Sequence, residues 1–326
     1  MKITTVLFCA AAFLSGRSSA YGAFLPDSSF SDDARGLTSA SFLKTPPSAR
    51  FEGMAGACLT QNGPQSFFCN PAGLANAPKG RVSSSFAYET LIEGSYRAAA
   101  SVVRGSGFGA FAAGLVYNNS SAGMDKYNTL GVSLGGFSAY DSALGAAFAR
   151  RYGFVDFGFG VKFIKSKLAE TSAVSGAFDA GFIFREAGRV KTEFSLAVRN
   201  VGAPLKLGSE KAPLPLEFGG GLKWKYTPEF DILFEGRLPC DHSPYLIIAG
   251  EWFLAFSPAE HRSPQAGVSG LFLRGGINFK NYSDLGALGA CSGGLGLKLG
   301  ILELDYAFVP YGDLGSTHRT EISWRF

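Results

Sequence analysis

The last nine residues of the chain, 318–326, alternate between two kinds of side chain. One set is Thr320, Ile322, Trp324 and Phe326, and the other is Arg319, Glu321, Ser323 and Arg325. Because successive side chains of a strand point to opposite faces, this order predicts a strand with one apolar and one charged face. A terminal strand that ends in an aromatic residue is typical of the transmembrane barrels of bacterial outer membranes. We take that architecture as the hypothesis for the rest of the chain.

Similar alternation recurs from residue 81 to the end of the chain. Bulky apolar residues occupy one parity and charged residues or glycines the other in residues 153–165, 174–186, 190–200, 214–226 and 301–308. Such a segment runs for about 9 to 13 residues, the length that a tilted strand needs to cross a bilayer. A water-soluble barrel with its two faces reversed would show the same alternation, so other features must distinguish the two.

The alternating segments predict about fourteen strands, an even number as in single-chain bacterial barrels. They lie at residues 81–90, 95–103, 107–117, 139–151, 153–165, 174–186, 190–200, 214–226, 229–237, 245–256, 265–278, 289–299, 301–308 and 318–326. Residues 129–137 are the least regular candidate, and we assign them to a loop. The predicted fold is therefore all-β, a transmembrane antiparallel β-barrel formed by residues 81–326.

The connections between these segments alternate between short and long. Short turns of such barrels face the periplasm and long loops face outward. Trp224, Trp252 and Trp324 then fall near the periplasmic ends of their strands, where an aromatic girdle is expected.

The first twenty residues have the features of a cleaved signal peptide. Lys2 supplies a positive start, residues 3–14 an apolar run, and Ser18, Ser19 and Ala20 the small residues before a cleavage site. The apolar run is shorter than the about 20 residues of a membrane-spanning helix. We therefore expect residues 1–20 to be removed on export and the barrel to lie in the outer membrane, in contact with lipid.

The composition supports a β-structure and offers little for metal binding. The chain contains 43 glycines among 326 residues and only 17% charged residues, whereas soluble domains average ~7% glycine and about 25% charged residues. Beyond the signal peptide, the cysteines are Cys58, Cys69, Cys240 and Cys291. None has the spacing of metal ligands. Cys58 and Cys69 are close enough in sequence to form a disulfide in an oxidising compartment, and four free thiols are the alternative.

The sequence gives little support to an enzyme. Gly131-Val132-Ser133-Leu134-Gly135 fits the nucleophile pattern G-x-S-x-G, but that motif needs a strand-to-helix turn, and no helix is predicted after it. We predict no catalytic residue, no cofactor and no metal site. The formal charge of +4 is scattered along the chain, which argues against nucleic acid as a partner.

The charged residues of the strands are expected to face the lumen. They have mixed sign, so they either line a pore or pair with one another and fill a closed lumen; we favour pairing. The residues concerned are Asp156, Lys162, Glu217, Lys223, Lys225, Glu303 and Asp305.

The irregular residues 21–80 precede the first strand and cannot cross lipid as loose backbone, because their polar groups would lack hydrogen bonds there. We expect them to form a hatch, or plug, inside the lumen, which fourteen strands make wide enough. The apolar residues that would line a ligand-binding surface there are Phe42, Leu43, Phe67, Phe68 and Leu74.

This region also carries a resemblance to a known family. Asn70-Pro71-Ala72-Gly73-Leu74-Ala75, preceded by residues 49–57, resembles the plug region of the FadL-type long-chain fatty-acid transporters, and more closely that of their PorV/PorQ-type relatives. Residues 200–202, 213–216, 304–306 and 312–319 extend the likeness over nearly the whole mature chain.

The resemblance implies a fourteen-stranded barrel with an N-terminal hatch that carries Asn70, Pro71 and Ala72. It implies uptake of hydrophobic small molecules, with long-chain fatty acids as the expected ligand. The PorV-type relatives suggest the alternative of a secretion accessory that binds exported proteins and components of a secretion system. An open diffusion pore is the third hypothesis.

Overall fold

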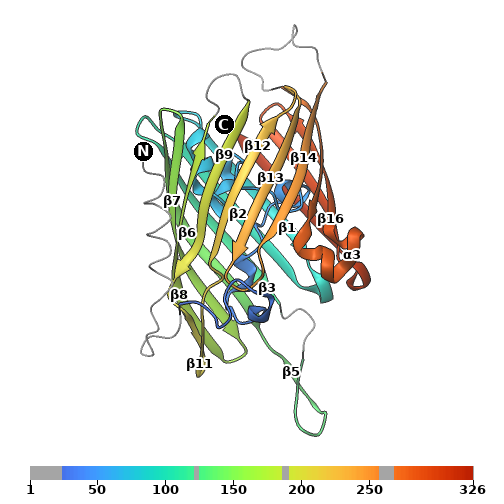
Figure 1. The fold of residues 1–326 in the computed structure, drawn as a ribbon. Coiled ribbons are helices and arrows are strands. Elements are labelled where there is room, and N and C mark those ends of the chain that lie inside the picture. The colour runs from blue at the N-terminus through green and yellow to red at the C-terminus, as the bar shows by residue number, and fades with distance from the viewer. Residues whose placement is uncertain (1–23, 121–124, 186–190, 257–267, 326) are drawn as a thin grey trace.

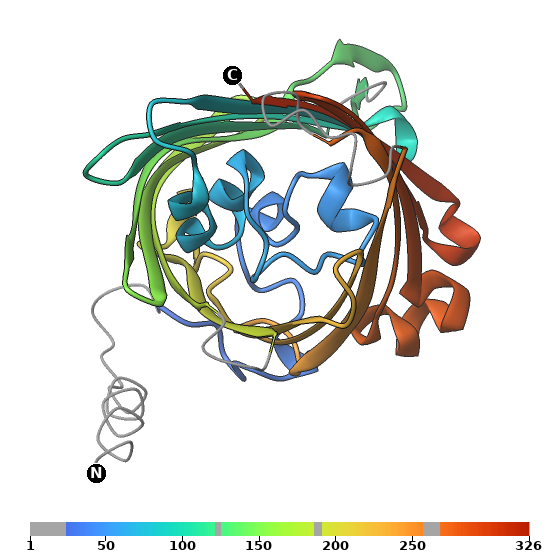
Figure 2. The same ribbon diagram turned by 90° about the horizontal axis from the view of Figure 1, so that it is seen from above.

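The computed structural model describes residues 24–120, 125–185, 191–256 and 268–325. The expected signal peptide, residues 1–20, lies outside these ranges. Within them, fourteen antiparallel strands form a closed barrel, shown from the side in Figure 1 and from above in Figure 2. The first and last strands pair with each other, so the sheet closes on itself and leaves no edge unpaired. The predicted number of strands is confirmed.

The strands of the wall are close to those that the alternation predicts. Their bounds are β1 (Val82–Thr90), β2 (Tyr96–Gly105), β3 (Ala110–Asn119), β6 (Ala139–Tyr152), β7 (Val155–Leu168), β8 (Thr171–Phe184), β9 (Thr192–Gly202), β12 (Glu217–Lys225), β13 (Phe230–Pro239), β14 (Tyr245–Ala255), β15 (Gly270–Asn278), β16 (Cys291–Leu299), β17 (Leu302–Pro310) and β18 (Ser316–Arg325). The register is unbroken between most neighbours, with one irregularity between β8 and β9 at residues 178–180.

The two faces of the wall differ as the alternation predicts. On β7, Phe159, Val161 and Phe163 are 44–56% exposed on the outer surface, whereas Asp156 is completely buried. A water-soluble barrel would show the reverse, with charges outside and aromatic residues inside. An apolar exterior around a charged interior is the arrangement that a bilayer requires.

One predicted strand begins later than expected. The alternation places Leu214 and Leu216 on the outer face of a strand that starts at residue 214, but β12 begins at Glu217. Both leucines are instead at most 4% exposed, and Leu214 packs in the interior beside Phe42. The prediction for these two residues was wrong because the buried loop before β12 happens to continue the same alternation.

Three predicted loops contain further structure. Residues 118–138 include a hairpin outside the barrel, β4 (Asp125–Tyr127) and β5 (Ser133–Gly136), and residues 201–213 include another, β10 (Leu205–Leu207) and β11 (Glu210–Ala212). Residues 279–288, expected to be irregular, form η7 (Phe279–Asn281) and most of α3 (Tyr282–Ala290), which lies beside the barrel in Figure 2. None of the helices in the described ranges is both long enough and apolar enough to cross a membrane.

Residues 24–80, here called the N-terminal segment, contain only short helices: η1 (Asp32–Ala34), η2 (Ser41–Leu43), α2 (Ala49–Glu52), η3 (Pro64–Phe68) and η4 (Pro71–Asn76). Figure 2 shows these helices from η2 onward within the ring of strands. Ser48 caps α2 by accepting a hydrogen bond from the backbone N–H of Phe51. A side-chain cap thus defines the start of α2, whereas η1, η2 and η3 begin without one.

The N-terminal segment runs along the lumen from one end of the barrel to the other. At the end with the long loops, the N–H of Phe30 donates to the Cys240 carbonyl and that of Ser39 to the Pro213 carbonyl, both at 2.9 Å. At the end with the short turns, the N–H of Gly80 donates to the Gly105 carbonyl, also at 2.9 Å. The segment therefore lies between the two openings.

Candidate functional site

Inward-facing glycines mark the places where the N-terminal segment touches the wall. A β-carbon built on Gly158 of β7 would lie 2.3 Å from the carbonyl carbon of Pro71, and one on Gly181 of β8 would lie 2.1 Å from the Asn70 side-chain oxygen. Corresponding approaches join Gly114 to Phe67, Gly276 to Met54 and Gly294 to Gly53. The glycines of the wall thus shape the surface on which the segment docks.

Asn70, Pro71 and Ala72 form the most closely held turn of the segment, and all three are buried. The side-chain oxygen of Asn70 accepts from the Ala72 N–H at 3.1 Å and so caps η4, which starts at Pro71. Its amide nitrogen donates to the Leu59 carbonyl at 2.7 Å. A single asparagine therefore fixes both the start of η4 and the neighbouring loop.

The five apolar residues expected to contact a ligand lie in two packed clusters. Phe42, Leu43 and Phe68 pack against wall residues such as Val116, and Phe67 and Leu74 pack in a second cluster. The cavity beside Phe42 and Phe68 has a volume of only ≈ 20 Å³. These residues fill their own space in this conformation, and their contact with a ligand stays a prediction.

The wall binds the segment through arginines that wall carboxylates hold in place. Arg97 pairs with Glu89 at 2.5 Å and donates to the Phe42 carbonyl at 3.1 Å. Arg199 pairs with Glu217 at 2.6 Å and donates to the Lys44 carbonyl at 3.1 Å. The planar guanidinium has five N–H donors, so one side can bind a carboxylate while another reaches a carbonyl.

A second network joins α2 to the opposite part of the wall. Arg50 pairs with Glu251 at 2.9 Å, and Arg274 pairs with the same Glu251 at 2.8 Å. Arg274 also binds Glu303 at 3.1 Å and Asp305. All the strand charges named from the sequence take part in ion pairs, so the prediction that they pair with one another is confirmed. The pairs are Asp156 with Arg185, Lys162 with Asp179, Glu217 with Arg199, Lys223 and Lys225 with Glu193, and Glu303 and Asp305 with Arg274.

Cys58 and Cys69 form a disulfide within the segment, with their Cα atoms 6.1 Å apart, while Cys240 and Cys291 are free. We expect the double substitution C58S/C69S to lower the free energy of unfolding by roughly 2–3 kcal/mol, because the unfolded chain loses a constraint on a short loop. Denaturant unfolding in detergent measures this change. C291S, which removes a free thiol from the wall, is the control and should leave the midpoint unchanged.

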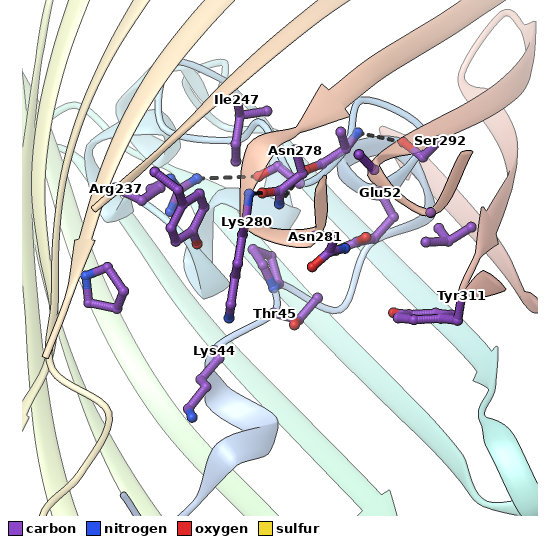
Figure 3. Close-up of a pocket in the computed structure, with 18 of the residues that line it drawn as sticks. Lys44, Thr45, Glu52, Arg237, Ile247, Asn278, Lys280, Asn281, Ser292 and Tyr311 are labelled. Carbon is purple, nitrogen blue, oxygen red and sulfur yellow. Dashed lines mark hydrogen bonds between the residues drawn. The ribbon is translucent and has the colours of Figure 1, made fainter. Parts of the chain in front are cut away.

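Figure 3 shows a cavity in the lumen that the sequence did not reveal. It has a volume of ≈ 220 Å³ and lies between the N-terminal segment and the strand ends beside the long loops. Lys44, Thr45 and Glu52 line it from the segment, and Lys280 and Tyr311 line it from the loops. No alternation marks loop residues such as Lys280, so a pattern of faces cannot identify them.

Ser133 has no catalytic surroundings. It lies in β5, exposed on the hairpin outside the barrel, and its hydroxyl is 3.4 Å from an Asp125 carboxylate oxygen. No helix follows β5, since the chain continues directly into β6. The nucleophile pattern is therefore coincidental.

Comparisons with solved structures identify the fold. The Ralstonia pickettii toluene transporter TbuX matches with a TM-score of 0.54 at 12% identity, over 86% of this chain and 97% of that one. A Pseudomonas aeruginosa FadL homologue matches with a TM-score of 0.52 at 11% identity, over 86% of this chain and 98% of its own. The chain has the fold of the FadL-type barrels.

A mutant of the monoaromatic hydrocarbon channel TodX shares this FadL-type fold, with a TM-score of 0.52 at 12% identity, over 85% of this chain and 97% of that one. The three structures are named as a transporter, a channel and a FadL homologue, and at 11–12% identity the likeness to this chain is one of fold. No protein-family model and no curated protein sequence matches the chain. The PorV/PorQ branch therefore stays a prediction.

Proposed function

We propose that this protein takes up hydrophobic small molecules across the bacterial outer membrane through a plugged barrel. The observation that carries the proposal is a FadL-type barrel whose lumen holds the N-terminal segment, together with an apolar outer surface that suits lipid. Contacts with β3, β7, β8, β15 and β16 surround the segment, and it acts as the hatch. An open diffusion pore would leave the lumen free for water and ions.

The two luminal cavities described above leave little room for a large ligand in the described conformation. The cavities of ≈ 20 Å³ and ≈ 220 Å³ are smaller than the about 300–1,000 Å³ of pockets that hold drug-sized ligands. Long-chain fatty acids, the ligands implied by the resemblance, would require the hatch to move and separate Phe42 and Phe68 from the wall. Such movement would break the hydrogen bonds of Arg97 and Arg199 to the segment.

Uptake into vesicles tests the proposal. We expect vesicles with an outer leaflet of lipopolysaccharide, which slows the entry of hydrophobic compounds, to accumulate radiolabelled toluene or hexadecanoate faster with the purified protein than without it. A labelled sugar should enter both at the same slow rate. The sugar should gain no faster entry from the protein, because a hatch that excludes bulk water leaves no aqueous path through the lumen. Equal accumulation of the hydrophobic compounds with and without protein would contradict the proposal, and rapid entry of the sugar would indicate an open pore instead.

A further inference from the structure

The cavity of ≈ 220 Å³ is lined by several charged side chains, in contrast to the two apolar clusters beside it. They come from the N-terminal segment, the wall and the long loops. The charged residues are Lys44, Glu52, Glu217, Arg237, Asp241 and Lys280. The balance of these charges decides which ligand the cavity favours.

Most of these charges already have partners. Glu52 pairs with Arg319 at 2.6 Å, Arg237 pairs with Glu217 at 2.8 Å, and Lys44 pairs with Asp241. Within the described residues, no carboxylate lies at ion-pair distance from the Lys280 amine, which lies 5.7 Å from the centre of the Tyr245 ring. Among the described residues, Lys280 is therefore the one charged residue of the cavity lining without an ion-pair partner.

The surroundings of Lys280 disfavour the positive charge of its amine. Burial lowers the pKa of Lys280, and the nearby positive charge of Lys44 lowers it further, while the carboxylates of Glu217 and Asp241 act in the opposite direction. Figure 3 shows the amine end of Lys280 directed toward Lys44 across the cavity. An anion placed there would gain from the Lys280 amine and would reduce its repulsion with Lys44, whose own charge is already paired with Asp241.

The remaining lining limits the size and shape of such an anion. The volume leaves room for a compact molecule but not for an extended acyl chain. Neutral donors can complete the binding of a carboxylate, and apolar side chains can contact its organic part. The donors are Thr45, Asn278, Asn281 and Tyr311, and the apolar residues are Pro46, Ile247, Ala290 and Val309.

We propose that this cavity binds a compact organic monoanion, an aromatic or short-chain carboxylate, between Lys280 and Lys44. Lys280, the one charged residue of the described lining without an ion-pair partner, favours a ligand with one negative charge, and the volume favours a small organic group. This inference rests on the uptake function proposed above and names a substrate class for it that carries a charge, unlike toluene.

Binding of benzoate and of its neutral analogue benzyl alcohol to the purified full-length protein tests the proposal. We expect benzoate to bind more tightly than benzyl alcohol to the wild-type protein in calorimetric titrations. K280Q should weaken benzoate binding roughly tenfold or more, because a charge-assisted contact is lost, and should leave benzyl alcohol unchanged. The matched control is K298Q, which removes a half-buried lysine near the C-terminal end of β16, outside the lining of the cavity.

Two results would overturn the inference. One is equal affinity of the wild-type protein for benzoate and benzyl alcohol, and the other is a benzoate affinity that K280Q leaves unchanged. Toluene uptake into vesicles separates this inference from the proposed function. Normal toluene uptake without selective benzoate binding rejects the anion site alone, whereas loss of all protein-dependent uptake rejects the transport function.

Discussion

Replacing Gly158 with valine should displace the N-terminal segment from the wall while leaving the barrel closed. The new β-carbon would lie 2.3 Å from the Pro71 carbonyl carbon and 2.5 Å from the Ala72 nitrogen, and backbone atoms of a buried turn cannot rotate away. Overpacking of this kind costs about 1–3 kcal/mol. We expect faster cleavage of the segment by trypsin than in the wild-type protein. We also expect sustained currents in planar bilayers, in which the wild-type protein should conduct little.

Gly176→Val is the matched control for this experiment. Gly176 lies in β8, the partner strand of β7, and the nearest atom to its added β-carbon is the Lys162 carbonyl oxygen at 3.8 Å. The control should keep the proteolysis pattern and the low conductance of the wild-type protein. Wild-type behaviour of Gly158→Val would show that the contact with Pro71 does not hold the segment in the lumen.

Removal of Arg274 should strongly destabilise the protein, because three luminal carboxylates share this one guanidinium. Its side chain is fully buried and binds Glu251, Glu303 and Asp305. R274M leaves Glu303 and Asp305 as buried carboxylates without their cation, a defect that costs roughly 3–5 kcal/mol. Urea unfolding in detergent, followed by tryptophan fluorescence, measures the loss.

The triple variant R274M/E303Q/D305N provides the control for charge. It removes the two stranded carboxylates, while Glu251 keeps its ion pair with Arg50. We expect most of the lost stability to return. If the triple variant is no more stable than R274M, the loss comes from the packing of the arginine stem and not from uncompensated charge.

The strands and their faces could be predicted from the sequence because side-chain direction repeats every two residues. That rule placed Phe159 outside and Asp156 inside, as the structure has them. It failed at Leu214 and Leu216, since a buried loop can alternate by chance. It also had no means of finding α3, where Gly286 adopts non-helical backbone angles within a short apolar run.

The glycine run at residues 293–296 shows why the luminal site was harder to predict. Such a run indicates close packing or a kinked wall, and the structure gives each inward glycine a separate role. Gly294 makes room for Gly53 of the segment, and Gly296 makes room for the pair of Arg274 and Asp305. These two partners lie on β15 and β17, on either side of β16, so their contact passes over Gly296. Strand order, register and glycine position must all be known before such a pair can be assigned.

The ion pairs of Arg319 join the seam of the barrel to the N-terminal segment. Arg319 lies on the last strand and binds Glu89 of the first strand at 2.5 Å, and it also binds Glu52 of the N-terminal segment at 2.6 Å. Arg319, at the seam between β1 and β18, therefore has both of its carboxylate partners only when the segment is in the lumen. Arg319 therefore ties the seam of the barrel to the segment, and displacing the segment would remove one of the two carboxylates that bind this arginine.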